Sequence, residues 1–199
     1  METVDSILRF WFGDERNDAE VAKERAALWW KKNPEIDEAI RERFEATLDG
    51  AVNEKHDHWL DDPHGRLALI ILADQFSRNM YRGTPRAFAN DSCALGWCKQ
   101  GLAVDSHLSL RPIERVFFYL PLEHSESLED QDRSVELFSE LAASVTEDQR
   151  EPFTGYVDYA VRHRDVIKQF GRFSHRNAIL GRESSDAELA FLRQPGSSF

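Results

Sequence analysis

The stretch LALIILA at residues 67–73 decides the fold, because it places seven consecutive apolar residues inside a longer helical pattern. Asp62 is a typical helix N-cap, and Pro63 fits the first turn of the helix that follows it. A helix without a polar face is buried on all sides. The sequence therefore predicts a central buried helix, around which the other helices pack.

Helical spacing of apolar residues recurs along the rest of the chain, and no stretch alternates as a half-buried strand does. We expect an all-α protein of about eight or nine helices in a single domain, residues 1–199. Pro121 is expected to end one helix, and Ser127 with Asp130 resembles a capping box for the next. The remaining helices are expected at 3–12, 17–30, 34–52, 85–100 and 153–170, with a short one after Ser184 or Ser185.

The composition excludes several classes of partner. The formal net charge is -11 and the pI is near 5.1, so phosphate backbones and anionic lipid surfaces would repel the molecule. We expect no nucleic-acid partner, no membrane partner and a cytoplasmic location, since METVDSILRF has none of the marks of a signal peptide. Five tryptophans and thirteen phenylalanines leave enough apolar surface for a possible homodimer.

The histidines and cysteines show no metal-binding motif. His56, His58 and His64 are close in sequence, but residues two apart do not share a helix face, and neither cysteine is nearby. Cys93 and Cys98 are five apart in a predicted helix, which favours neither a disulfide nor a metal clip. We expect no metal and no cofactor.

The first candidate motif, ADQFSRN, continues the apolar helix at residues 73–79. Asp74 and Arg78 are four residues apart, so they can pair along one helix face, with Gln75 beside them. If that face is buried, further polar groups should converge there, because two desolvated ions are costly. The alternative is a surface salt bridge at a helix end.

The second candidate motif, PLEHSE at residues 121–126, follows an apolar aromatic helix. His124 and Glu126 have the chemistry of an acid/base pair. Ser125 cannot form a nucleophile, base and orienter line with its immediate neighbours, because adjacent side chains diverge. The alternative is that the serines cap the next helix and the acids are its first-turn charges.

The third candidate motif, FGRFSHRN at residues 170–177, lies in the most basic segment of this acidic chain. Residues 162–182 contain six lysines or arginines against one acid, Asp165. Planar guanidinium groups bind carboxylate or phosphate in two-bond geometry, so Arg172 and Arg176 are candidate anion ligands. The alternative is that these two arginines pair with Asp74 and Glu126 and hold distant segments together.

These three strings, with RFWFGD at 9–14, RGTPRAFAND at 82–91 and the ending QPGSSF, resemble the bacterial family named domain of unknown function 924. The resemblance covers essentially the whole chain. It implies a tetratricopeptide-like, right-handed stack of antiparallel helix pairs without the repeat consensus. The polar positions that recur in the family correspond here to Asp74, Gln75, Arg78, Asn79, His124, Ser125, Glu126, Arg172, His175, Arg176 and Asn177.

The resulting hypothesis is one polar pocket that binds a small anionic molecule or a peptide carboxylate. Its ligand-binding residues would be Gln75, Arg78, Asn79, Ser125, Arg172, Arg176 and Asn177, and its proton-transfer residues would be His124, Glu126, His175 and Asp74. Any catalysis would be acid/base chemistry without a cofactor, and the sequence does not decide whether a reaction occurs. The alternative is a helical-solenoid module that binds a protein segment, with the polar motifs purely structural.

Overall fold

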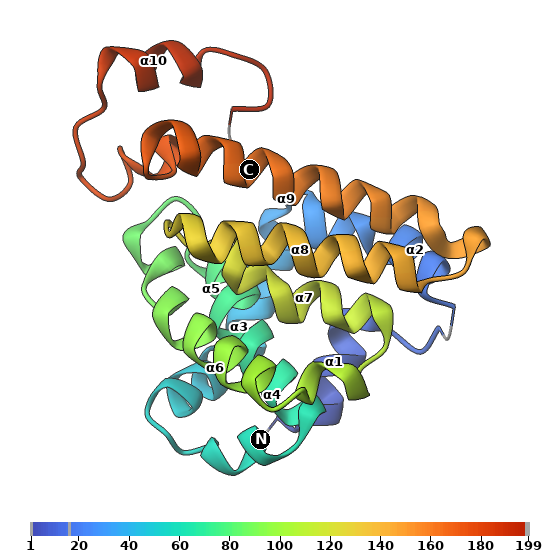
Figure 1. The fold of residues 1–199 in the computed structure, drawn as a ribbon. Helices are drawn as coiled ribbons and strands as arrows, with labels where there is room; N and C mark the ends of the chain where they lie inside the picture. The colour runs from blue at the N-terminus through green and yellow to red at the C-terminus, as the bar shows by residue number, and fades with distance from the viewer. Residues whose placement is uncertain (1, 16, 198–199) are drawn as a thin grey trace.

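A computed structural model describes residues 2–15 and 17–197, and these ranges contain helices and no strand, which confirms the all-α prediction (Figure 1). The last two residues of the QPGSSF string, Ser198 and Phe199, lie outside the described residues. The helices are α1 Val4–Phe12, α2 Asp18–Trp30, α3 Pro34–Val52, α4 Pro63–Ile70, α5 Ser77–Met80, α6 Asp91–Ala103, α7 Pro112–Glu123, α8 Leu128–Ser144, α9 Arg150–Phe170 and α10 Asp186–Leu192.

The central helix is formed by α4, a π-helical turn at Ile71–Phe76 and α5, which follow one another without interruption. The Asp62 carboxylate accepts a hydrogen bond from the Gly65 N–H at 2.8 Å, so the predicted cap is confirmed. Every residue from 65 to 77 is buried, which includes the whole apolar stretch at 67–73. Counted as one helix, this element makes nine helices within the described ranges, in agreement with the predicted number.

An aromatic cluster joins the first helices to this centre. Trp11 of α1 is fully buried, and its ring lies 5.4 Å from the ring of Phe76 and 5.4 Å from that of Phe117 on α7. Trp29 of α2 lies 4.6 Å from Phe117 between ring centroids. Such edge-to-face pairs bring together elements far apart in sequence.

Two predicted helix boundaries and one predicted capping box are wrong. Helix α7 continues through Pro121 to Glu123, because its last turn is buried between neighbouring helices and the packing there outweighs the proline's missing donor. The Ser127 side chain makes no capping bond, since Asp130 instead accepts from Ser125 at 2.7 Å and pairs with Lys99. The helix expected at 85–100 begins only at Asp91, after a short 3₁₀ turn at Pro85–Phe88.

Helices α8 and α9 lie side by side as a hairpin, and the C-terminal segment with α10 folds near one end of α9 (Figure 1). The described part of the chain contains no helix that is both long and apolar enough to cross a membrane. The tetratricopeptide-like twist of the stack and the assignment of residues 1–199 to one domain stay predictions.

Candidate functional site

The π-helical turn of the central helix carries the first two site residues. Its wider turn places Asp74 and Gln75 in succession among buried side chains, at 1% and 7% exposure. The Gln75 amide donates to one oxygen of Asp74 at 2.5 Å. Turns of this kind are rare in helices and are frequent at functional sites.

His124, at the end of α7, contacts the other oxygen of Asp74. Its Nδ1 lies 2.7 Å from Asp74 Oδ1, although the two residues are fifty positions apart. Burial by itself raises the pKa of Asp74, but Arg78 and His124 lower it by more, so Asp74 is an anion. Burial and the charge of Arg78 lower the pKa of His124, so the ring is neutral, donates from Nδ1 and keeps Nε2 as an acceptor.

Arg78 and Arg176 meet at Asp91, the first residue of α6. Arg78 pairs with Asp74 at 3.1 Å, as predicted, and also binds both oxygens of Asp91, at 2.8 and 3.1 Å. Arg176 donates from Nη1 to Asp91 at 3.3 Å. The ADQFSRN and FGRFSHRN motifs therefore converge, through Asp74, Arg78 and Arg176, on one buried network. Asp91 also belongs to this network, although it was not among the candidates chosen from the sequence.

A pocket of about 370 Å³ opens above this network. Its polar lining comes from α6, from the PLEHSE motif and from Arg176 of the FGRFSHRN motif, and no residue of the ADQFSRN motif is among the lining residues. Its apolar lining comes from the turn before α6, from α6 itself, from α7 and from the C-terminal segment. The lining residues are Pro85, Phe88, Ala89, Asp91, Ser92, Leu95, Pro121, His124, Ser125, Glu126, Arg176 and Leu180.

Arg176 is the arginine among the lining residues of this pocket, and its guanidinium has few hydrogen bonds. It is 6% exposed, and its guanidinium lies 4.8 Å from the ring of Phe88 and 4.5 Å from that of Phe173. Its Nε has no hydrogen-bond partner among the described residues. Burial and the charge of Arg78 lower the pKa of Arg176 to about 10, which still leaves it protonated at neutral pH.

His175 lies beside this network and is half-buried, but it is not among the residues that line the pocket. Its ring lies 5.7 Å from that of Phe173. Burial and the neighbouring Arg176 lower its pKa to about 4, so it is a neutral group next to the cations.

Glu126 and Ser125 line the pocket, yet their polar atoms are engaged by the protein. Glu126 accepts from both ends of the Arg182 guanidinium, at 2.7 and 3.0 Å, and from the Phe173 N–H at 2.8 Å. Ser125 donates to Asp130. His124 and Glu126 therefore do not form the expected pair: each contacts a different partner on a different element.

Arg172 and Asn177 face away from the pocket. Arg172 binds both oxygens of Glu188 at 2.8 Å, and Asn177 donates to the same carboxylate at 3.0 Å. Neither Arg172 nor Arg176 contacts Asp74 or Glu126 directly, so the internal pairing considered from sequence is replaced by pairing with Glu188 and Asp91. The Arg172 pair anchors α10, where Glu188 lies, to the end of α9.

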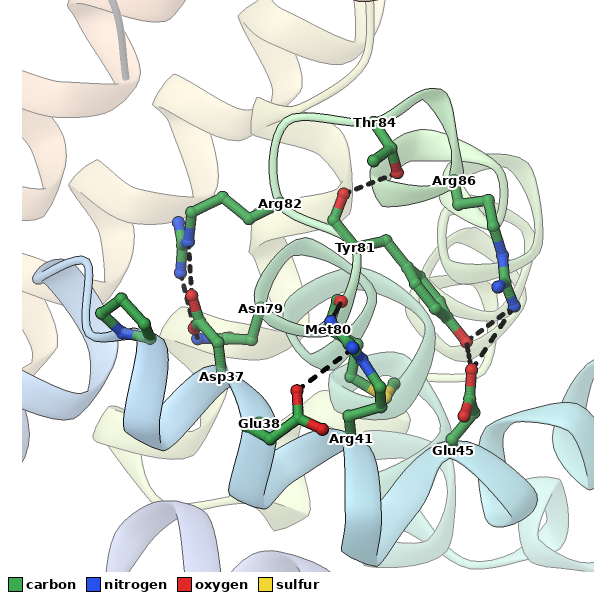
Figure 2. A pocket seen from close by; sticks show the side chains of 11 residues that line it. Asp37, Glu38, Arg41, Glu45, Asn79, Met80, Tyr81, Arg82, Thr84 and Arg86 are labelled. Atoms are coloured by element: carbon green, nitrogen blue, oxygen red, sulfur yellow. Dashed lines mark hydrogen bonds and ion pairs between the residues drawn. The ribbon is translucent and has the colours of Figure 1, made fainter.

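Asn79 contributes to a different and larger pocket, of about 560 Å³, between α3 and the segment that follows α5 (Figure 2). It donates to Asp37 at 2.8 Å, and Arg82 binds the same carboxylate at 2.7 and 2.9 Å. Figure 2 shows that the other charged side chains there also pair with one another, namely Arg41 with Glu38 and Arg86 with Glu45. This pocket is therefore lined by ion pairs that already satisfy each other.

A second feature that the sequence analysis missed lies beneath His124. Glu123 of α7 and His163 of α9 are each 4% exposed, and Glu123 Oε1 lies 3.3 Å from His163 Nδ1. One ligand-type atom of Glu123, of His124 and of His163 lies within 4.8 Å of the other two. These three residues could hold a metal ion. Glu123 and His124 stand in the PLEHSE string and His163 stands in the helix expected at 153–170. Nothing in either stretch of sequence indicates that these residues meet.

This geometry defines the class of the protein. It is all-helical, with a buried network of aspartate, histidine and arginine beside a small pocket. The chain belongs to the family described as "Bacterial protein of unknown function (DUF924)", whose profile matches residues 7–196. It is similar to the solved structure of a protein of unknown function from Agrobacterium tumefaciens, with 31% identity, 96% of each chain covered and a TM-score of 0.80. A comparison with curated proteins found no match.

Proposed function

We propose that the chain binds a small carboxylate-containing molecule in the pocket at Arg176, as a soluble cytoplasmic protein. The observation that carries the proposal is the incomplete hydrogen bonding of the Arg176 guanidinium, which is buried and lines the pocket. Among the described residues it has one hydrogen bond, of 3.3 Å, to Asp91. A buried charge that is not fully paired is costly. A carboxylate would supply the missing acceptors in two-bond geometry.

The remaining lining supports a ligand with an apolar body. Phe88, Leu95, Pro121 and Leu180 present apolar surface beside the polar lining residues. A volume of about 370 Å³ is at the lower end of the range for small-molecule sites, so we infer a ligand of modest size.

Net charge does not by itself select the ligand. The two arginines Arg78 and Arg176 are balanced by Asp74 and Asp91. Geometry distinguishes the two arginines instead. Arg78 is paired with both Asp74 and Asp91, whereas Nε of Arg176 has no hydrogen-bond partner among the described residues. We therefore assign the ligand carboxylate to Arg176 alone, which narrows the three-arginine site expected from sequence.

His124 gives the pocket a group for proton transfer. Asp74 holds its Nδ1, so Nε2 is the ring nitrogen left to contact a ligand. His124 lines the same pocket as Arg176, whereas Asp74 lies behind it, and this supports a base near a bound anion. We include in the proposal that Asp74 and His124 transfer a proton to or from the bound molecule. The free thiols Cys93 and Cys98 fit the reducing compartment that it assumes.

The test is a thermal-shift series with small aliphatic and aromatic monocarboxylates, each compared with its neutral amide. At about 100 times the dissociation constant a ligand adds about 2.7 kcal/mol, which corresponds to a rise in Tm of roughly 5–10 °C for a chain of this size. Arg176→Lys keeps the positive charge but loses the guanidinium edge that can make two hydrogen bonds to a carboxylate. The ligand-induced rise in its Tm should therefore fall below half of the wild-type value. Arg164→Lys, at a partly exposed position of α9 that does not line the pocket, should behave as wild type.

A second variant separates binding from folding. Leu180 is 37% exposed at the pocket rim, so Leu180→Trp fills the pocket without touching the buried network. Its own Tm should remain close to that of wild type, while the carboxylate-induced shift disappears. Equal shifts with amides and carboxylates, or an unchanged shift in Leu180→Trp, would contradict the proposal.

A further inference from the structure

Two histidines and a carboxylate meet in the interior beneath the pocket. Glu123 and His124 come from the last turn of α7 and His163 comes from α9, and their ligand-type atoms lie within 4.8 Å of one another. Glu123 and His163 are both 4% exposed. Within residues 2–15 and 17–197, the only ion-pair contact of Glu123 is with the His163 ring, so no lysine or arginine balances this buried carboxyl.

Both imidazoles are oriented by an acceptor on Nδ1. His124 Nδ1 lies 2.7 Å from Asp74 Oδ1, and His163 Nδ1 lies 2.9 Å from the Tyr159 carbonyl oxygen. A proton held on Nδ1 of His124 makes its Nε2 the nitrogen that can accept, and His163 Nδ1 also has Glu123 Oε1 beside it at 3.3 Å. Metal-binding histidines are oriented in this way, by a carboxylate or a backbone carbonyl on the other ring nitrogen.

The backbone that carries Glu123 and His124 is held in place by one fully buried amide. The Gln131 side chain donates to the carbonyl oxygens of Leu122, Glu123 and Ser125, at 3.3, 2.6 and 2.7 Å. The two candidate ligands also stand at the C-terminal end of α7, where the helix dipole favours a cation. The ligands are therefore positioned in advance, as a metal site requires.

We propose that Glu123, His124 and His163 bind one divalent transition-metal ion of the zinc type. Two imidazole nitrogens and one carboxylate oxygen form a donor set that zinc accepts, and three protein ligands leave a fourth position for water or a ligand. This proposal replaces the expectation of no metal, which was drawn from His56, His58 and His64. It does not depend on the carboxylate pocket, although an ion on Nε2 of His124 would transfer the proton-transfer role to metal-bound water.

The test is titration of the full-length, tag-free chain, stripped with a chelator, with Zn²⁺ and Co²⁺. We expect about one ion per chain, a rise in Tm on addition of Zn²⁺, and the visible absorption bands of four-coordinate Co²⁺. Glu123→Gln preserves shape and removes the carboxylate, and His163→Asn retains a donor for the Tyr159 carbonyl and removes Nε2. Each should weaken binding by about tenfold or more.

Two controls make the outcome decisive. His58→Asn removes an exposed histidine that could bind metal adventitiously, and it should leave the affinity and the Co²⁺ bands unchanged. Arg176→Lys should also bind metal as wild type does, so failure of the carboxylate proposal is distinguishable from failure of this one. Absence of stoichiometric binding by wild type, or equal binding by a well-folded Glu123→Gln, would overturn the metal site.

Discussion

Arg172 and Arg176 lie four residues apart in the same basic segment, and their surroundings are opposite. The Arg172 side chain is 32% exposed and binds Glu188 through two bonds, whereas the Arg176 side chain is 8% exposed and has one longer bond. The first arginine therefore anchors α10, and the second is the one that we propose binds a ligand. Residue type and sequence position are alike in the two cases, so the partner decides the role.

The carboxylate of Glu188 gives a residue-scale prediction about pH. Glu188 is 2% exposed and accepts from Arg172, Ser174 and Asn177, and the bond from Arg172 lowers its pKa below the ordinary value of 4.5. A lowered folded pKa gives stability that is complete above the unfolded pKa and is lost as the pH falls through the folded pKa.

We therefore expect Glu188→Gln to be less stable than wild type near pH 7, with a gap that shrinks steadily below about pH 4.5. Urea unfolding at a series of pH values measures the gap. Asp165→Asn, at an exposed site on α9, is the control and should show no such trend. A gap that is constant from neutral to acid pH would show that the charge of Glu188 is not what stabilises the end of α9.

At the scale of elements, the position of the central helix is set by its apolar surface and by the helices that pack against it. The π-helical turn lies where the apolar stretch changes into the Asp74 motif, so the change in helical pitch and the start of the site coincide. Two serines of the candidate motifs use their hydroxyls within the network: Ser77 accepts from Asn90 and Ser174 donates to Glu188.

Two glycines in different helices should respond to the same substitution with opposite signs. A Cβ at Gly65 of α4 would lie 2.3 Å from the Trp59 carbonyl oxygen, which is backbone and cannot rotate away. A Cβ at Gly155 of α9 would meet nothing within 4 Å. Gly65→Ala should cost about 1–3 kcal/mol of unfolding free energy, and Gly155→Ala should add about 0.5–1 kcal/mol.

Chemical unfolding of both variants against wild type checks the pair. The helical circular dichroism of the folded proteins should be the same in all three, because neither change alters the helix length. If Gly65→Ala were neutral, the close approach of the 3₁₀ turn at Asp57–Asp61 to α4 would not be a constraint on the fold.

For the whole molecule, one aromatic cluster connects the N-terminal helices to α7 and to the central helix. Trp11 is fully buried against Trp29, Phe76 and Phe117, while Trp30 is 49% exposed and stacks on Phe117 from outside. The site lies in the same assembly of helices, because α7 carries Phe117 in its middle and His124 at its end. A loss of packing in this cluster should therefore lower the free energy of unfolding of the whole molecule.

We expect Trp11→Ala to lower the free energy of unfolding by about 3–5 kcal/mol, because a large buried ring is removed and a cavity remains. Trp30→Ala removes the same ring from a half-exposed position and should cost roughly 1 kcal/mol. Denaturant titration followed by circular dichroism measures both losses. Similar losses for the two tryptophans would contradict the assignment of Trp11 to the core.

The sequence alone determined the helical class, the central buried helix at 67–73 and the pairing of Asp74 with Arg78. These features are local, since helical periodicity and the i, i+4 rule relate residues within one or two turns. It also placed Arg78, His124 and Arg176 among the candidates, and the structure brings these three together around Asp74 and Asp91.

Only the tertiary structure decided which acid meets which arginine. Asp91 is 13 positions from Arg78 and 85 from Arg176, and Glu123 meets His163 across two helices. Contacts over such separations depend on how helices pack, and local periodicity carries no information about that packing. For the same reason the expected partner of His124 was Glu126, two residues away, whereas the folded chain supplies Asp74, fifty residues away.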